Sequence, residues 1–337
     1  MIIKEAILEN EINKVKEFLK DVGLNYDRDI NYTVYIEEND EIIGTISTAQ
    51  NIIKCFAINP KYQGQNLGNT LISHIINYFH DRSIYYYQVY TKPENVDIFL
   101  SFNFNLIASS KNVSLLECRN VTIVETLERV KNNLKLTSED IASIVVNTNP
   151  PTNGHLYLIT TASQNHQQVL VFLVEEDRSV FKFKDRYHML INATKHLSNV
   201  KILPSTKYIV SSLTFPTYFL KEDVDEVLEQ AEIDAIIFKK YFMTIFGIKK
   251  RYVGTETDLV TNKYNQKLKE ILGDDLIIID RIKHDGKIIS ATMIRRLLAE
   301  GKIEDVKQYV PQATYDFLTS EEGKKTIQKL QDVYKNG

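Results

Sequence analysis

The 337-residue sequence lacks tryptophan and contains only two cysteines, seven prolines and twelve glycines. Cysteines as far apart as Cys55 and Cys118 argue against a disulfide framework or a zinc site, and we expect both to be buried thiols. No apolar run approaches the length that spans a bilayer, and charges follow Met1 closely, so we expect a cytoplasmic protein without a membrane partner. A net charge of −3 offers no general attraction to nucleic acid.

The length predicts two domains, because 337 residues are more than one hydrophobic core usually serves. Residues 1–120 mix strands and helices as an α+β domain does, and residues 121–140 form a charged, helix-forming connection. From Ile141 onward apolar strands alternate with amphipathic helices, which is typical of a parallel sheet covered on both faces. We therefore expect residues 141–337 to form a Rossmann-like α/β domain, with later strands starting at Val169, Asn199, Asp234, Lys250 and Asp275.

Residues 144–159, IVVNTNPPTNGHLYLI, have the pattern of a strand, a tight turn and a helix. The pair Pro150-Pro151 prevents a central strand from continuing, and the helical pattern begins after Gly154. A helix N-terminus offers free N–H groups and the positive end of a dipole to an anion, and glycine allows close approach. Because Thr152 and His155 flank this point, the turn is a candidate phosphate site.

A second motif, Ile-Ser-x-Thr-x-x-Arg, occupies residues 289–295. Ser290 is a good N-cap, so Arg295 falls in the early turns of the following helix, where a guanidinium can contact phosphates. Together with the Thr/His-x-Gly-His motif this segment resembles the nucleotidyltransferase superfamily, whose fold is Rossmann-like. The resemblance implies catalytic roles for His155, Thr152 and Arg295. It implies ATP contacts from Asn149, Pro150, Asn153, Gly154, Gly254, Thr255, Glu256, Ser290 and Thr292.

A second glycine-bearing loop, QGQNLG at residues 63–68, lies between a predicted strand and an amphipathic helix. It resembles the pyrophosphate loop of the GNAT acetyltransferase superfamily, with Asn66 where that superfamily usually has glycine. The resemblance implies a GNAT-like domain over residues 1–120. It also implies contacts to a coenzyme A-like arm from Gln63, Gly64, Gln65, Asn66 and Gly68.

The combination resembles the citrate lyase ligase family over nearly the whole chain, with further matches at VEEDRSVFKFKDR, TFPTYFL and RYVGTE. This resemblance implies an acid–thiol ligase that forms acetyl-AMP from acetate and ATP and releases pyrophosphate. The acetyl group would then pass to the thiol of a coenzyme A-derived arm on the citrate lyase acyl carrier protein, releasing AMP. Arg178 and Ser179 are expected near the substrate. Magnesium is expected with ATP, held mainly by phosphates and water, because no carboxylate cluster looks like a metal site.

Three alternatives fit parts of the same pattern. A sibling acetate ligase would serve malonate decarboxylase. A cofactor nucleotidyltransferase would transfer adenylyl to a phosphorylated acceptor, and it shares both nucleotide motifs but does not need the GNAT-like half. A sensor would bind nucleotide or coenzyme A at these loops without catalysing a reaction.

Overall fold

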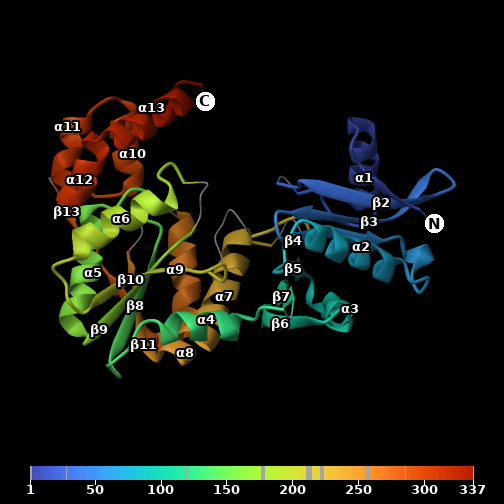
Figure 1. The fold of residues 1–337 in the computed structure, drawn as a ribbon, viewed down its shortest axis with the longest axis horizontal. Coiled ribbons are helices and arrows are strands. Elements are labelled where there is room, and N and C mark those ends of the chain that lie inside the picture. Colours follow the sequence, from blue (N-terminus) through green and yellow to red (C-terminus); the bar gives the residue numbers. More distant parts are fainter. Residues whose placement is uncertain are drawn as a thin grey trace. The chain divides into compact units, whose positions relative to one another are not determined.

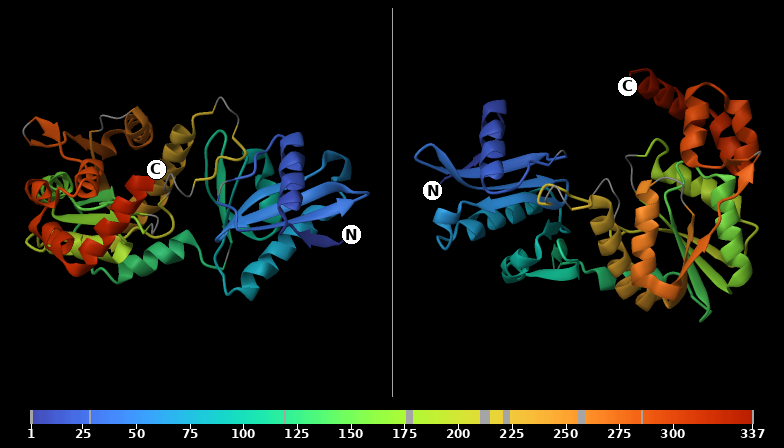
Figure 2. Two further views of the ribbon diagram at one scale, coloured as in Figure 1. Left: turned by 90° about the horizontal axis from the view of Figure 1, so that it is seen from above. Right: turned by 180° about the vertical axis from the view of Figure 1, so that it is seen from behind.

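The computed structural model describes residues 2–27, 29–118, 120–175, 179–209, 215–220, 224–255, 259–284 and 286–336. The chain forms two compact units (Figures 1 and 2). Unit 1 comprises Met1–Val130 and Val210–Ile237, and unit 2 comprises Lys131–Ile209 and Phe238–Gly337. The chain therefore leaves unit 2 after Ile209, contributes a segment to unit 1, and returns to unit 2 at Phe238.

Unit 1 is built on a seven-stranded sheet in the order β1-β2-β3-β4-β5-β7-β6. Its strands are β1 (Ile3–Glu5), β2 (Tyr32–Glu38), β3 (Glu41–Ala49), β4 (Ile52–Ile58), β5 (Gln88–Thr91), β6 (Phe104–Ser109) and β7 (Ser114–Cys118). Its helices are α1 (Glu9–Asp21), α2 (Leu67–Asp81), α3 (Val96–Ser101), α4 (Ile123–Asn132) at the boundary, and α7 (Glu226–Ile237). Helix α2 packs its apolar face on the sheet, so its N-terminal loop lies near the end of β4.

Strands β4 and β5 are the parallel pair in this mainly antiparallel sheet, and they separate after two residue pairs. Beyond Ile53, β4 carries a bulge in which Cys55 and Phe56 lie opposite the single residue Ile46 of β3. Cys55 has φ 51°, the left-handed conformation that such a bulge can require. The bulge redirects the β4 backbone, and the strands diverge toward their carboxyl ends.

Unit 2 is built on a five-stranded parallel sheet in the order β10-β9-β8-β11-β12. The strands are β8 (Ile141–Val146), β9 (Gln168–Leu173), β10 (Val200–Pro204), β11 (Ile248–Gly254) and β12 (Leu276–Ile279), beside the small hairpin β13 (Lys283–His284) and β14 (Lys287–Ile288). The helices are α5 (Asn153–Asn165), α6 (Phe183–Thr194), α8 (Thr244–Phe246), α9 (Leu259–Leu272), α10 (Ala291–Ala299), α11 (Ile303–Val306), α12 (Gln312–Thr319) and α13 (Glu321–Asn336). The strand order reverses between β8 and β11, and ligands of such sheets bind at the carboxyl ends beside that point.

The strand expected from Asp234 is wrong, because these residues complete α7 and continue into π-helical turns over Phe238–Met243. Phe238, Phe242 and Phe246 recur at every fourth position, and all three rings contact Phe172 of β9. A short apolar run does not distinguish a buried helix from a buried strand, and the helical spacing of these rings decides this case.

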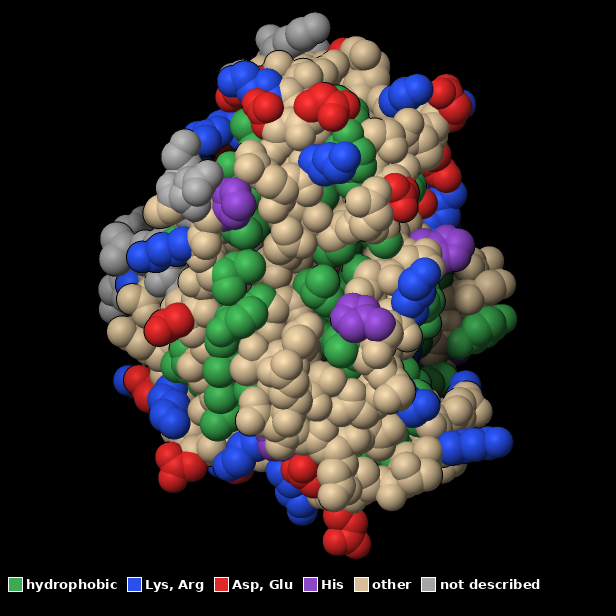
Figure 3. Space-filling model, turned by 90° about the vertical axis from the view of Figure 1, so that its left-hand side faces the viewer, with side chains coloured by type: hydrophobic (Ala, Val, Ile, Leu, Met, Phe, Trp, Pro, Cys, Tyr) green, Lys and Arg blue, Asp and Glu red, His purple; other side chains and the backbone are tan. Residues whose placement is uncertain are grey.

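Acidic and basic side chains are interspersed on the face shown in Figure 3. This distribution agrees with the small net charge of −3. In the part of the chain that the structure describes, no helix is both long and apolar enough to cross a membrane.

Candidate functional site

The turn between β8 and α5 has two reciprocal hydrogen bonds. Thr152 Oγ1 accepts from the His155 N–H at 3.4 Å, and the Thr152 N–H donates to His155 Nδ1 at 3.1 Å. A Cβ atom on Gly154 would lie 3.3 Å from the carbonyl oxygen of Ile289, so this position leaves little room for a side chain. The glycine therefore lets the turn lie directly against the second motif.

The His155 ring is partly exposed but densely surrounded by protein atoms. This desolvation, with a smaller effect from the positive charge of Arg281, lowers the pKa of His155 to about 4. The imidazole is therefore neutral near pH 7. Because Nδ1 accepts the Thr152 N–H, the ring proton belongs on Nε2, from which it can be donated to a phosphate oxygen.

The second motif forms the start of α10. Ser290 Oγ accepts from the Met293 N–H at 3.1 Å and caps this helix. Arg295 Nη1 donates to the Asn149 carbonyl at 2.7 Å, and Arg295 Nη2 donates to Thr292 Oγ1 at 3.1 Å. Burial lowers the pKa of Arg295, yet a guanidinium remains charged near neutral pH. The cation is thus fixed between the two motifs.

Gly254 and Thr255 lie where β11 ends, at the same carboxyl edge. The Thr255 N–H donates to the Ile279 carbonyl at 2.8 Å, and Thr255 Oγ1 accepts from the Arg281 N–H at 3.1 Å. Arg281 was not predicted from sequence. In the structure its Cγ would lie 3.6 Å from a Cβ on Gly254, and its positive charge acts on His155. A basic residue two positions after the end of β12 was the signal that could have indicated it.

Arg186 of α6 is the second residue that the sequence did not reveal. It is fully buried, and its guanidinium donates to the carbonyls of Phe181 at 2.9 Å, Asn147 at 2.7 Å and Val174 at 2.9 Å. These contacts connect the loops after β8 and β9 to α6. They thereby fix the loop that leads from β8 to the Thr152 turn. One arginine in an amphipathic helix pattern gives no sign of such burial.

The predicted residues of unit 2 that the structure describes all follow the carboxyl ends of β8, β9 and β11 or start α5 and α10. The Asn149-Pro150 peptide bond is cis, and Asn149 Oδ1 accepts from the Phe181 N–H at 3.1 Å. Asn153 Nδ2 donates to the Gln308 carbonyl at 3.1 Å, and Ser179 Oγ donates to Asn147 Oδ1 at 3.4 Å. Arg178 and Glu256 lie outside the described residues.

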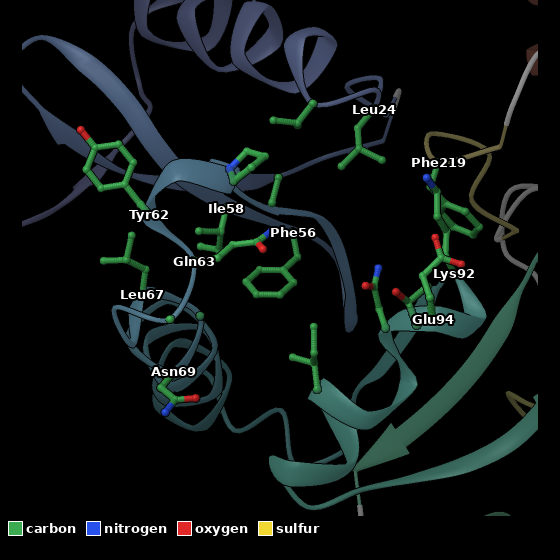
Figure 4. Close-up of a pocket in the computed structure, with 18 of the residues that line it drawn as sticks. Leu24, Phe56, Ile58, Tyr62, Gln63, Leu67, Asn69, Lys92, Glu94 and Phe219 are labelled. Atoms are coloured by element: carbon green, nitrogen blue, oxygen red, sulfur yellow. The ribbon is translucent and has the colours of Figure 1, made fainter.

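Unit 1 contains a pocket of about 800 Å³ beside the diverging ends of β4 and β5 (Figure 4). Gln63, Gly64, Asn66 and Gly68 line it, and Gln65 is not among its lining residues. Asn66 has φ 64° and is the N-cap of α2, so it takes the left-handed conformation for which glycine is usual. Although glycine is usual at this position, Asn66 adopts the left-handed backbone conformation that a glycine would allow.

Comparisons with known proteins cover both units. The citrate lyase ligase C-terminal domain family matches residues 141–318, and the acetyltransferase (GNAT) domain family matches residues 5–116. The [citrate [pro-3S]-lyase] ligase of Escherichia coli (strain K12) is 31% identical over 314 residues, covering 90% of this chain and 89% of that protein. The protein of the same name from Haemophilus influenzae is 31% identical over 320 residues, covering 92% and 96%. Among solved structures, a bifunctional NMN adenylyltransferase/ADP ribose pyrophosphatase from Francisella tularensis is 21% identical, covers 58% of this chain and 53% of its own, and has a TM-score of 0.39.

Proposed function

The chain belongs to the citrate lyase ligase family, and on this premise we propose that it joins acetate to a carrier-bound thiol with ATP in the cytoplasm. It is an acid–thiol ligase, and the names of its relatives indicate citrate lyase as the enzyme that it serves. The thiol would belong to the coenzyme A-derived arm of the citrate lyase acyl carrier protein.

The hydrogen bond from Arg295 to the Asn149 carbonyl, 2.7 Å long, is the observation on which the proposed site depends. It brings the positive charge of Arg295, a residue of α10, to the turn that precedes α5. In the proposed complex the triphosphate of ATP lies along this junction. His155 and the first N–H groups of α5 then face the α-phosphate, and Ser290, Thr292 and Arg295 face the β- and γ-phosphates.

The first step of the proposed reaction is attack of an acetate oxygen on the α-phosphorus, which breaks the bond to pyrophosphate and leaves acetyl-AMP. Such a transfer depends mainly on positioning and on stabilising the charge that develops on phosphate oxygens. The neutral His155 Nε2–H would donate to an α-phosphate oxygen while Thr152 holds the ring. Arg295 would neutralise the departing pyrophosphate, and Gly254 and Thr255 would contact the nucleoside.

The second step is attack of the arm's sulfur, as thiolate, on the acetyl carbonyl, which forms a thioester and releases AMP. Coenzyme A-like arms would dock in the unit 1 pocket, where the backbone around Gly64 and Asn66 can receive a phosphate. Sulfur would carry the acetyl group away from the nucleotide site. Unit 1 thus supplies the acceptor and unit 2 the activated acid.

Magnesium would enter with ATP. Among the described residues, no group of three or more His, Cys, Asp or Glu side chains could hold a metal ion. The ion would therefore be bound through phosphate oxygens and water, and it would neutralise charge on the leaving pyrophosphate.

The test is isotope exchange between ATP and pyrophosphate, followed by mass measurement of the carrier. Exchange should require acetate, and addition of the citrate lyase carrier should convert its arm thiol to the acetyl thioester with release of one AMP. Exchange that proceeds equally well without a carboxylate would contradict the first step. Acetylation of the malonate decarboxylase carrier but not the citrate lyase carrier would instead identify the sibling function.

A further inference from the structure

Helix α13 packs against α10, the helix that carries Arg295 (Figure 1). Leu330 of α13 is buried in the same hydrophobic cluster as Leu298 of α10. Beside it, Gln331 Nε2 donates to the Leu298 carbonyl at 3.1 Å. Tyr334 follows Leu330 by four residues and Gln331 by three, and positions with this spacing are neighbours on one face of a helix. Tyr334 therefore lies on the face of α13 that meets α10.

Tyr334 is also level with Arg295 along the two helices. Arg295 precedes Leu298 by three residues and Tyr334 follows Gln331 by three, so in antiparallel helices each lies about 4.5 Å beyond the Gln331 hydrogen bond in the same direction. In parallel helices the two residues would be about 9 Å apart along the axis. The pKa of Arg295 is lowered by burial and raised electrostatically by Tyr334, which shows that the two side chains are close. The helices are thus antiparallel, and Tyr334 is a neighbour of the cation at the candidate phosphate site.

Both side chains keep hydrogen-bonding capacity for a ligand. Two of the five N–H donors of Arg295 are used, by the Asn149 carbonyl and by Thr292 Oγ1. Tyr334 is 52% exposed, and its hydroxyl has no hydrogen-bond partner among the residues that the structure describes. A tyrosine hydroxyl and a guanidinium are both donors to phosphate oxygens. Their position side by side, next to the Ser290 start of α10, indicates a shared ligand.

We propose that Tyr334 belongs to the ATP site and donates a hydrogen bond to the terminal phosphate that Arg295 also binds. This inference rests on the proposed function, because it needs ATP bound along the junction of α5 and α10. The hydroxyl contacts the outer side of the triphosphate, and the capped start of α10 contacts the inner side. Helix α13 thereby recognises the part of ATP that AMP lacks.

The consequence is a difference between the nucleotide that enters the reaction and the one that leaves it. ATP and pyrophosphate contact both Tyr334 and Arg295. AMP keeps only the α-phosphate, which faces His155 and the start of α5, and it does not reach α13. Affinity for ATP and pyrophosphate therefore depends on Tyr334, and affinity for AMP does not.

The test measures binding of magnesium–ATP, magnesium–pyrophosphate and AMP to the full-length protein by calorimetry, without acetate. Tyr334→Phe keeps the ring and removes only the hydroxyl. It should weaken binding of ATP and pyrophosphate about tenfold, as loss of one hydrogen bond to a charged group does, and should change AMP binding less than about twofold. Tyr315→Phe is the matched control, because the Tyr315 hydroxyl of α12 already donates to Glu304 at 2.8 Å. It should leave all three affinities unchanged.

A double variant tests whether Tyr334 and Arg295 bind the same group. Side chains that share a partner are coupled, so the effects of Tyr334→Phe and Arg295→Met on ATP affinity should not add. The double variant should bind ATP more tightly than the product of the two single losses predicts. Additive losses would place the two side chains on different groups and would contradict the proposal.

The outcomes separate this inference from the proposed function. If Tyr334→Phe weakens ATP and AMP by the same factor, the hydroxyl only supports the fold, and the inference is overturned. Unchanged affinity for ATP and pyrophosphate would overturn it as well. A wild-type protein that binds ATP but shows no acetate-dependent exchange would contradict the ligase reaction, while the ratio of ATP to AMP affinity still decides the role of Tyr334. A wild-type protein that does not bind ATP would overturn both.

Discussion

Two helix starts, at α5 in unit 2 and at α2 in unit 1, follow a strand and a glycine-bearing loop but differ in what surrounds them. At α5 the Thr152 hydroxyl caps the helix, His155 is a neutral donor, and the charge of Arg281 acts on the ring. At α2 the N-cap Asn66 makes no side-chain capping hydrogen bond. The first start presents oriented donors and a cation, whereas the second presents backbone in an open pocket.

Under the proposed function, this difference implies that a phosphate-binding loop does not by itself define a reaction. In the proposed reaction, charge develops on phosphate oxygens when acetate attacks ATP, and fixed donors stabilise that charge most when they are oriented in advance. A coenzyme A-like arm that is bound without reacting at its phosphate develops no such charge, and backbone amides are sufficient to bind it. The following variants test whether the two starts differ in this way, beginning with the largest expected effect.

Substituting His155 by alanine should reduce acetate-dependent exchange about 100- to 1,000-fold, the range seen when one oriented donor is removed. Binding of ATP should survive, because Arg295 and the α10 residues remain. His196→Ala is the matched control, since His196 is exposed on unit 2, and it should leave the exchange rate unchanged. Exchange at the wild-type rate in the His155→Ala protein would remove the chemical distinction between α5 and α2.

The neighbouring arginines of α10 provide a second matched pair. Arg295→Met should weaken interaction with ATP and pyrophosphate about 10- to 100-fold, because hydrogen bonds to charged groups contribute about 1.5–3 kcal/mol. Arg296→Met should have little effect, since the Arg296 side chain is 67% exposed and its partner is Glu300 at 4.0 Å. The measurements are KM for ATP and the exchange rate. Equal effects of both substitutions would contradict the assigned position of Arg295.

Asn66→Ala tests the unit 1 start. Alanine in the left-handed conformation costs about 1 kcal/mol, so unfolding free energy should fall by about that amount and phosphopantetheine binding should weaken several-fold. Asn66→Gly is the control and should retain both, because glycine adopts this conformation without strain. Acetate-dependent exchange should be unchanged in each variant. A loss of exchange in Asn66→Ala would show that the two starts are not independent.

Much of the fold was predictable because it depends on local pattern. Alternation of apolar strands and amphipathic helices predicted the parallel sheet of unit 2, and the structure confirms it. The hairpin turn at Asn39-Asp40 also depends on local pattern, with φ 51° and 64° at the two residues, as a tight hairpin requires. At the site, the short motifs indicated Thr152 and Arg295 because each contains its own cap or spacing signal.

Residues whose position depends on tertiary contacts could not be predicted. Arg186 carries no local signal, since its burial arises only when α6 packs. For Arg281 the place after β12 is a local signal, but its proximity to His155 arises only when β12 packs. The Tyr218 hydroxyl donates to the Tyr90 carbonyl of β5, far from it in sequence, and no pattern indicates that its segment enters unit 1. The expected strand at Asp234 was wrong because an apolar run fits a buried helix equally well.

The smallest expected effect concerns pH, and it distinguishes the environment of His155 from that of an exposed imidazole. With a pKa of about 4, only about one His155 ring in a hundred is protonated at pH 6, against about three quarters at an ordinary pKa of 6.5. The value of kcat/KM for ATP, which reports the free enzyme, should therefore change less than twofold between pH 8 and pH 6 through this group.

Because the folded-state pKa lies below the unfolded one, the unfolded chain binds more protons between pH 6.5 and 4, and stability linked to His155 decreases only as pH falls through that window. An imidazole NMR signal that is missing from the His155→Ala protein should titrate near pH 4. Titration near pH 6.5 would show that the ring is solvated and that the start of α5 is less preorganised than its contacts indicate.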